Sequence, residues 1–390
     1  MSNKLFIQNT EIGSGLPILN KYGAIAKQRL IEYISKLLLE RNYIPVASPH
    51  IGNLSLFETS GHYPYYKDSM FPIINTEKDG IVDASFVLKP MNCPFHIMTY
   101  KDLGNVSYKE LPVKIYEFGQ VYRNEDSGAI NGLFRCRSFT QDDGHIFCTV
   151  SQINEIVDEC VILVKQICDR VGFSLSVRYS KRDPSNTEKY VGDSGSWGIS
   201  EDILKSICHN QFGDNYVEDV GGAAFYGPKI DFVAKDKLNR EWQLGTIQLD
   251  FNLPERFKLS YIDNDGSKQV PVLIHRALLG SIERFLGVLQ EIGIPEWLNP
   301  FNLGIIDITK TPENKSYIDS LILRIKSHQV YPTLISHPAN LSGAIKKMHD
   351  NGIDNVIVIG DRDANTQTIM LNNIKYTVPE FYTWIERFKV

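Results

Sequence analysis

Residues 112–148 read PVKIYEFGQVYRNEDSGAINGLFRCRSFTQDDGHIFC, and this stretch decides the fold. Its first part, VKIYEFGQVYRNE, alternates side chains and is rich in aromatic and β-branched residues, which predicts a strand. SGAING supplies small turn-forming residues, so that LFRCRSFTQDDGHIF returns as a second strand. Alternation places six of its side chains on one face of the sheet: Arg135, Arg137, Phe139, Gln141, Asp143 and His145. These residue types suit the floor of a site for a charged, planar ligand; the alternative is a solvated face of an ordinary antiparallel sheet.

The composition is that of an ordinary globular protein. The 390 residues are 43% hydrophobic and 22% charged, with a net charge of −5 and a pI near 6.0, and they suffice for a large and a smaller domain. This charge gives no global attraction to nucleic acid, so a polyanion would need a local basic patch. No run approaches the ~18 apolar residues of a membrane span, and we find no signal peptide. Six cysteines without a C-x-x-C pair predict a reducing cytosol; an organelle matrix is compatible.

Other elements surround this hairpin. Apolar residues at helical spacing predict amphipathic helices over residues 21–40 and 151–171. The polar segment 186–216 is expected to be irregular, with a helix near 201–210. Two further strands are predicted within 221–236 and 240–254. Residues 270–291 are expected to form a short apolar strand that runs into a helix, with Arg276 at the opening of the helix.

A second domain follows a boundary segment at residues 295–302, which contains two prolines and a tryptophan. The predicted division is residues 1–297 and 298–390. Strand and helix patterns alternate in the second part, which predicts a small α/β domain with a largely parallel sheet. From residue 301 onward the chain has ten Lys and Arg and nine Asp and Glu, so the charge of this domain does not predict a nucleic-acid-binding surface.

Three arginines predict a nucleotide site in the large domain. Arg123, Arg135 and Arg284 can grip phosphate oxygens, Phe139 can stack on a base, and Glu125 can accept from an exocyclic amine. The sequence lacks G-x-x-x-x-G-K-[ST] and a strand-linked G-x-G-x-x-G, which disfavours P-loop and Rossmann folds.

Cys93, His145 and His275 form a second possible constellation. One thiolate and two imidazoles with an open position are the ligands of a catalytic-type zinc site. However, their spacing fits no local zinc motif, so a buried cysteine and two core histidines are the default from spacing alone. His62, in the aromatic-rich segment TSGHYPYYKDSMF, is likewise either structural or catalytic.

Several long motifs resemble the catalytic and C-terminal domains of threonyl-tRNA synthetase, a class II aminoacyl-tRNA synthetase. They cover most of residues 13–297 in the family's order. The motifs are KPMNCPFH (89–96), YRNEDSGAINGLFRCRSFTQDDGHIFC (122–148), GAAFYGPKIDF (222–232), WQLGTIQLDF (242–251) and PVLIHRALLGSIERF (271–285). The resemblance implies an α+β fold: a class II antiparallel sheet flanked by helices, with a small C-terminal α/β domain of the anticodon-binding kind.

The resemblance also implies site residues. Arg123 would bridge the ATP α-phosphate and the amino-acid carboxylate, Glu125 would face adenine, and Phe139 and Arg284 would sandwich it. The adenylate site would be completed by Arg135, Lys229, Gln243, Thr246 and Ser281. The threonine pocket would be lined by Gln141, Asp143, Tyr226 and Gln248. One Zn²⁺ per subunit would be held by Cys93, His145 and His275. His62 would take a proton from the tRNA ribose, and Pro49 matches the motif of the class II dimer.

The implied activity is that of a threonine–tRNA ligase. Threonine and ATP, with Mg²⁺, would give threonyl-adenylate, and transfer to tRNA(Thr) would follow. Zinc would bind the substrate amino and hydroxyl groups directly, with Asp143 accepting the hydroxyl proton. Because valine lacks this hydroxyl it would be rejected by roughly 10⁴ or more, whereas serine differs by a methyl worth about 1–3 kcal/mol.

Departures from the family keep alternatives open. The sequence starts almost directly at the catalytic domain, so we expect no editing in cis and a possible separate trans-editing protein. Phe95 and Ser138 stand where the family usually has glycine, and the anticodon-facing motifs are altered. A paralogue that loads a non-tRNA carrier, or a non-catalytic regulatory paralogue, are the alternatives.

Overall fold

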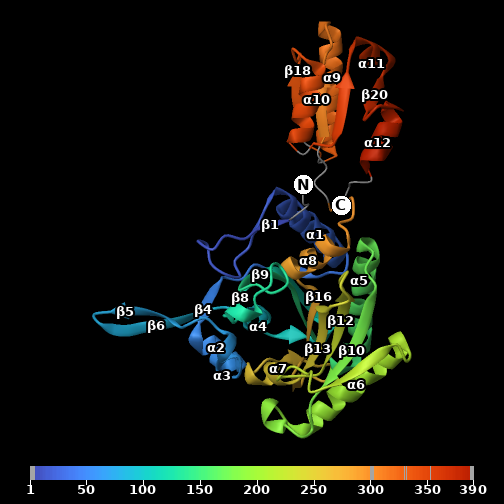
Figure 1. Ribbon diagram of the computed structural model, residues 1–390. Helices are drawn as coiled ribbons and strands as arrows, with labels where there is room; N and C mark the ends of the chain where they lie inside the picture. Colours follow the sequence, from blue (N-terminus) through green and yellow to red (C-terminus); the bar gives the residue numbers. More distant parts are fainter. Residues whose placement is uncertain (1–4, 299–302, 329, 331, 352, 387–390) are drawn as a thin grey trace. The chain divides into compact units, whose positions relative to one another are not determined.

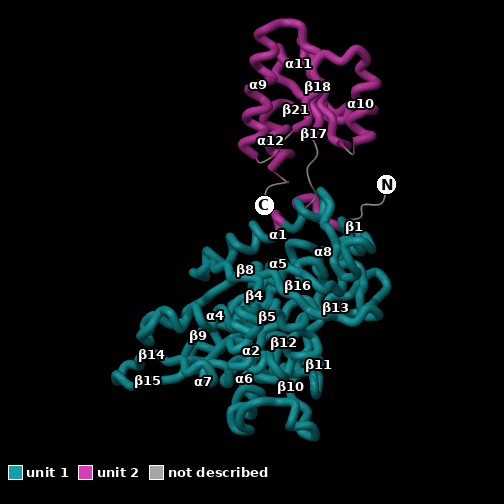
Figure 2. The backbone as a smooth tube through the Cα atoms, turned by 90° about the vertical axis from the view of Figure 1, so that its left-hand side faces the viewer, with its two compact units in different colours: residues 1–27, 31–293 teal, residues 28–30, 294–390 magenta. Residues whose placement is uncertain are grey.

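The computed structural model describes residues 5–298, 303–328, 330, 332–351 and 353–386 (Figure 1). The chain divides into two compact units, residues 1–27 with 31–293 and residues 28–30 with 294–390 (Figure 2). Residues 299–302 of the predicted boundary segment lie outside the described part. The division at residues 297 and 298 therefore stays a prediction.

A large sheet forms the centre of the first unit. Its described strands run antiparallel, except that the outermost strand at each edge lies parallel to its neighbour. The predicted antiparallel sheet flanked by helices is thus confirmed. In order across the sheet the strands are β11 (Tyr216–Val220), β10 (Leu175–Lys181), β12 (Lys229–Lys235), β13 (Glu241–Asp250), β16 (Val272–Ser281), β9 (Ser138–Cys148), β8 (Val113–Tyr122) and β3 (Ile44–Pro45).

Long helices pack on this sheet as the apolar periodicity predicts. α5 (Ile153–Val171) buries its apolar stripe, Cys160 and Cys168 included, against β13 and β16, and ends at Gly172, whose φ of 77° suits glycine. α6 (Ser194–Phe212) is longer than the helix expected near 201–210, because Asp193 caps it by accepting from two backbone amides. The others are α1 (Lys21–Leu39), α4 (Cys93–Asp102) and α8 (Ile282–Ile292).

Small elements surround the central sheet. A projecting hairpin, visible in Figure 1, belongs to a small sheet of β4 (Ile51–Asn53), β6 (Ile81–Leu88) and β5 (Ile74–Lys78). Another contains β15 (Lys268–Gln269), β14 (Tyr261–Ile262) and β7 (Val106–Ser107), and β1 (Phe6–Ile7) pairs with β2 (Ile18–Leu19). The short helices are α2 (Leu54–Ser60), α3 (His62–Tyr65), α7 (Asn252–Arg256) and five 3₁₀ turns at Lys67–Ser69, Tyr108–Glu110, Ser127–Ala129, Val150–Gln152 and Thr187–Lys189.

The second unit is a small α/β domain with a mixed sheet. β17 lies between β18 and β19 in parallel, as predicted, whereas β20 and β21 continue the sheet antiparallel. Its core packs strand residues such as Ile305 and Ile357 against Ile318 and Phe381 from helices. The elements are β17 (Leu303–Asp307), α9 (Pro312–Ser327), β18 (Thr333–Ser336), α10 (Leu341–Asp350), β19 (Asn355–Ile359), α11 (Asp361–Thr366), β20 (Thr368–Leu371), β21 (Ile374–Thr377) and α12 (Val378–Glu386).

Among the described residues of both units, no helix has the length and apolar character needed to span a membrane.

A buried ion pair holds a bulge between the two central strands. Arg276 lies opposite Gly144 and Gly280 opposite Asp142, so four steps along β16 correspond to two along β9. Asp142 accepts from the backbone amides of Leu278 and Leu279 at 2.8 and 3.0 Å, and from Arg276 Nη1 at 2.5 Å. Both charged side chains are fully buried. The expectation that Arg276 opens the helix is therefore wrong: it lies inside β16, and the helix begins after Ser281.

Asp142→Asn is expected to lower the free energy of unfolding by about 3–5 kcal/mol, because it leaves the Arg276 guanidinium buried without its counter-charge. Urea denaturation followed by tryptophan fluorescence measures this. Glu241→Gln breaks the surface pair with Arg178 and serves as the control, with an expected loss within about 1 kcal/mol. If both variants lost the same small amount of unfolding free energy, the conclusion that Asp142 and Arg276 hold the bulge would be contradicted.

Candidate functional site

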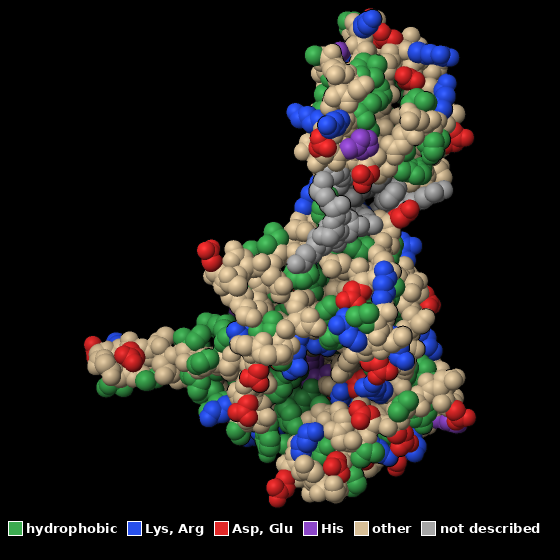
Figure 3. Space-filling view, viewed as in Figure 1, with side chains coloured by type: hydrophobic (Ala, Val, Ile, Leu, Met, Phe, Trp, Pro, Cys, Tyr) green, Lys and Arg blue, Asp and Glu red, His purple; other side chains and the backbone are tan. Residues whose placement is uncertain are grey.

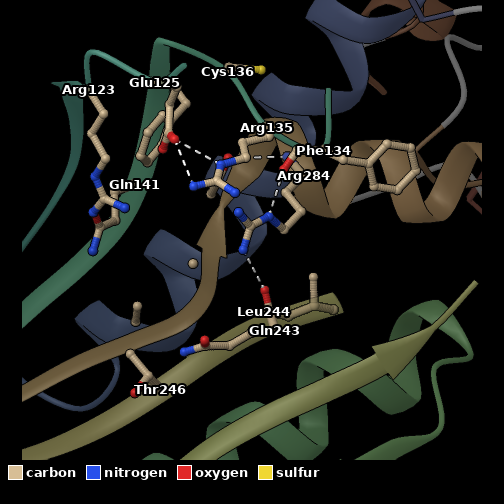
Figure 4. A pocket seen from close by; sticks show the side chains of 14 residues that line it. Arg123, Glu125, Phe134, Arg135, Cys136, Gln141, Gln243, Leu244, Thr246 and Arg284 are labelled. Carbon is tan, nitrogen blue, oxygen red and sulfur yellow. Dashed lines mark hydrogen bonds and ion pairs between the residues drawn. The ribbon is translucent and has the colours of Figure 1, made fainter. Parts of the chain in front are cut away.

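Side chains from β9, β13, β16 and the segment that follows β8 line two adjoining pockets on one face of the sheet. Figure 3 shows the hollow in the first unit, with charged side chains around it and a histidine inside. The first pocket is open to solvent and contains about 590 Å³ of space not filled by protein atoms. All eight predicted ATP-binding residues line it (Figure 4): Arg123, Glu125, Arg135, Phe139, Gln243, Thr246, Ser281 and Arg284.

Guanidinium groups crowd this first pocket. Arg123 lies over the rings of Phe139 and Tyr66, 5.1 and 5.6 Å from their centroids. Arg284 donates to the backbone carbonyls of Phe134 and Gln243 at 2.8 and 3.0 Å (Figure 4). Burial, followed by the charges of Arg123 and Arg135, lowers the pKa of Arg284. An anion between these cations would relieve their repulsion, so the pocket is built for phosphate or carboxylate oxygens.

Arg135 was expected on the second strand of the central hairpin, but it lies outside that strand. β9 begins at Ser138, and Arg135 lies in the preceding turn, where its guanidinium donates to Glu125 at 2.8 Å. Arg137 is not among the residues that line the pocket, and it donates to the Glu125 carbonyl at 3.0 Å. The prediction of six side chains on one strand face is therefore wrong for these two arginines, because the turn residues break the alternation.

The second pocket adjoins the first and contains all four residues predicted to bind threonine. Tyr226 donates to Gln248 at 2.6 Å, and Asn92 donates to Asp143 at 2.9 Å. Burial raises the pKa of the Asp143 carboxyl group. The lining residues are Met91, Cys93, Arg123, Gln141, Asp143, Tyr226, Thr246, Gln248, His275, Arg276 and Ala277.

Three polar residues line both pockets and carry unsatisfied atoms. Arg123 Nε, Gln141 Oε1 and Thr246 Oγ1 are buried without a hydrogen-bond partner in the described protein. Buried polar atoms are normally paired, so these donors and acceptors point to a ligand at the junction of the two pockets.

Cys93, His145 and His275 come together although they are far apart in the sequence. Their ligand atoms lie within 4.8 Å of one another, and all three residues are buried. His275 Nε2 lies 2.8 Å from Asp250 Oδ2, so Nε2 carries the hydrogen and Nδ1 presents a lone pair to His145 Nε2, 2.9 Å away. Burial raises the pKa of the Cys93 thiol well above its usual value. A cation among one sulfur and two nitrogens would stabilise the thiolate, and this donor set fits zinc.

His62 and Lys229 lie outside the lining of both pockets. Ser60 Oγ lies 2.8 Å from His62 Nδ1 and 3.0 Å from the Phe57 carbonyl oxygen. His62 Nε2 lies 3.2 Å from the sulfur of Met91, which lines the second pocket. Lys229 is paired with Asp231 at 2.5 Å.

Two residues at the site were not singled out by the sequence analysis: Met91 lines the second pocket, and Asn92 donates to Asp143 from outside that lining. Asn92 and Met91 lie beside Cys93 in the motif KPMNCPFH, and that neighbourhood is the signal that could have indicated them. Phe95, which replaces a glycine of the family, faces Phe57 and Gly52 and not the pocket. Ser138 accepts from Gln120 at 2.6 Å and also lies outside the lining of both pockets.

Residues 75–293 match the family described as the tRNA synthetase class II core domain (G, H, P, S and T). The chain belongs to this family. It is 40% identical over 372 residues to the threonine–tRNA ligase of Chlorobium phaeobacteroides, which covers 94% of this chain and 56% of that protein. The chain thus spans little more than half the length of this relative.

Solved structures agree. The RNA binding domain of threonyl-tRNA synthetase from Cryptosporidium parvum is 32% identical with a TM-score of 0.86, covering 99% of this chain and 96% of that one. The putative threonyl-tRNA synthetase ThrRS-1 of Aeropyrum pernix is 29% identical, with a TM-score of 0.77. The match covers 97% of this chain and 89% of that one. The resemblance found in the sequence is confirmed.

Protonation of His62 is expected to destabilise the fold. Burial, followed by the charge of His275, lowers the pKa of His62 to about 3, so below pH 6.5 the unfolded chain binds a proton that the folded chain does not. Stability is present above pH 6.5 and is lost as the pH falls, by about 2 kcal/mol between pH 7 and 5. Urea unfolding should show a loss that is smaller by this amount in His62→Asn than in the wild type, because the buried His145, whose pKa burial also lowers, contributes to both. The exposed His209→Asn, as control, should retain the full loss; identical pH profiles in all three proteins would contradict the assignment.

Proposed function

We propose that this chain is a threonine–tRNA ligase, which activates L-threonine with ATP and transfers it to tRNA(Thr). The observation that carries the proposal is the junction of the two pockets. Arg123, Gln141 and Thr246 line both, with buried polar atoms left to pair with a ligand. A carboxylate held in the second pocket would meet an α-phosphate held in the first at this junction.

The first step joins the two substrates. A threonine carboxylate oxygen attacks the α-phosphorus, the bond to the bridging oxygen of the β-phosphate breaks, and pyrophosphate leaves. Arg123 would neutralise charge on the α-phosphate, while Arg284 and Arg135 would face the terminal phosphates with Mg²⁺. Phe139, Glu125, Gln243 and Ser281 would hold the adenosine. Lys229, which is paired with Asp231, would act from the edge of this site.

Amino-acid selection would take place in the second pocket. Cys93, His145 and His275 would hold zinc, which when bound supplies a Lewis acid for the amino and hydroxyl groups of threonine. Asp143, fixed by the Asn92 amide, would accept the substrate hydroxyl, and Tyr226, Gln248 and Gln141 would complete the pocket.

Transfer requires a tRNA and a proton acceptor. The terminal ribose hydroxyl attacks the carbonyl carbon of the adenylate, and AMP leaves. His62, whose Nε2 lies beside Met91 of the second pocket, would take the hydroxyl proton. The active species would be a homodimer, with Pro49 exposed beside the edge strand β3 as part of the contact. Seryl-tRNA formed by error would be cleared by a separate editing protein.

Aminoacylation of total tRNA is the deciding measurement. Zinc-replete protein is expected to charge tRNA with labelled threonine, and Cys93→Ala should abolish charging because it removes a metal ligand. Cys168→Ala is buried to a similar degree on α5, outside the lining of both pockets, and serves as the control for folding, read by circular dichroism. Threonine-dependent pyrophosphate exchange without tRNA charging would overturn the tRNA part and favour a different carrier.

Arg123→Gln is expected to lower kcat/KM for threonine-dependent pyrophosphate exchange by about 10²–10³, because it removes charge stabilisation at the reacting phosphate. Arg137→Gln is the matched control, since Arg137 lies outside the lining of both pockets. An equal loss in both variants would contradict the role given to Arg123.

A further inference from the structure

His96 lies behind the candidate metal ligand His145 and has no role in the proposed reaction. Together with His145 and His275 it forms a row of three buried histidines. His145 Nδ1 lies 2.8 Å from His96 Nδ1, and His145 Nε2 lies 2.9 Å from His275 Nδ1. His96 and His145 are fully buried, and their rings stand at 89° to one another. We call His96, His145 and His275 the imidazole chain.

A carboxylate stands at each end of the imidazole chain. Asp250 Oδ2 faces His275 Nε2 at 2.8 Å, and Glu117 Oε1 faces His96 Nε2 at 3.2 Å. The second contact has the distance of an ion pair, although its angle is not that of a good hydrogen bond. Each carboxylate can only accept, so each holds a hydrogen on the imidazole nitrogen that faces it.

The hydrogens of the whole chain follow from these two ends. With its hydrogen on Nε2, His96 presents a lone pair at Nδ1, so His145 must donate from its own Nδ1. A neutral His145 then has an unprotonated Nε2, which faces the unprotonated Nδ1 of His275 next to Cys93. Two lone pairs 2.9 Å apart repel one another unless a cation lies between them. The arrangement therefore points both nitrogens at a metal.

We propose that His96 and Glu117 are positioning residues that fix the Nδ1–H tautomer of His145, so that its Nε2 can bind a divalent metal ion. The inference rests on the metal site of the proposed function. Carboxylate–histidine pairs behind a metal-bound histidine orient the ring and raise the ligand's basicity. Here a second imidazole lies between the carboxylate and the ligand.

Glu117 is itself held in place. Its Oε1 and Oε2 accept from the hydroxyl and the amide of Ser48 at 2.5 and 2.9 Å, and Lys89 Nζ lies 3.5 Å from Oε1. Burial alone would raise the pKa of Glu117, but the contact with His96 and the Ser48 donors hold this pKa at about 2. The carboxylate is therefore ionised, and it is a fixed acceptor at the end of the chain.

The test measures metal binding by the full chain, with Zn²⁺ in competition with a chelator. His96→Leu removes the acceptor for His145 Nδ1–H and is expected to weaken zinc affinity by about 10–100-fold. His96→Asn keeps a carbonyl oxygen that can accept this hydrogen and should restore most of the affinity. The d–d spectrum of the Co²⁺-loaded protein should change in His96→Leu and not in His96→Asn.

Two controls separate this effect from simple loss of stability. Ile97→Ala truncates a fully buried neighbour on α4, and Glu283→Gln neutralises a carboxylate that is as buried as Glu117. Both should keep wild-type zinc affinity, whereas Glu117→Gln should lose about tenfold. Unchanged affinity in His96→Leu would overturn this inference alone. A wild type that binds no zinc would overturn it together with the metal part of the proposed function, and pyrophosphate exchange would still test the remainder.

Discussion

The buried pair of Asp142 and Arg276 is the constraint on which the candidate site depends. β16 supplies His275 to one pocket and Ser281 to the other, and the bulge that separates them would have unpaired backbone amides without the Asp142 carboxylate. Two charges without solvent contact gain little net stability over a well-packed apolar pair, but the loss of one partner is costly. The pair therefore adds little net stability, but it restricts β9 and β16 to a single register.

The same strands carry a second polar system on their opposite face. Glu117 and Asp250 lie on different strands, yet together they determine the hydrogen position on every imidazole between them. The buried amide of Asn92 does the same for Asp143. The reacting face is thus preorganised by acceptors and donors outside the two pockets, which is how rigid sites avoid reorganisation during the reaction.

Much of this was accessible from the sequence, and the reasons for the rest are physical. The period-two pattern of the central hairpin correctly indicated Phe139, Gln141, Asp143 and His145 on one face, because a regular strand transmits alternation. It failed at Arg135 and Arg137, where a turn interrupts the ladder. Arg276 was expected at the opening of a helix after a short apolar strand, but the strand continues through it, and its buried partner Asp142 lies on β9. The candidate metal triad and the imidazole chain arise from the pairing of β9 with β16 and the packing of helix α4 against β9. Spacing along the sequence could not show that these residues lie together. For Cys93, His145 and His275, only the family resemblance indicated it.

Alternation along β9 divides its residues into two independent sets. Residues 141 and 143 line the pockets and residue 145 belongs to the candidate metal site, whereas residues 142 and 144 serve the scaffold: Asp142 closes the bulge, and a Cβ at Gly144 would overlap the Arg276 guanidinium. Under the proposed function, the odd positions could be randomised to change the preferred amino acid while the even ones stay fixed. In a combinatorial library of β9, the codons of the odd positions would vary ligand binding, and the codons of the even positions would preserve folding.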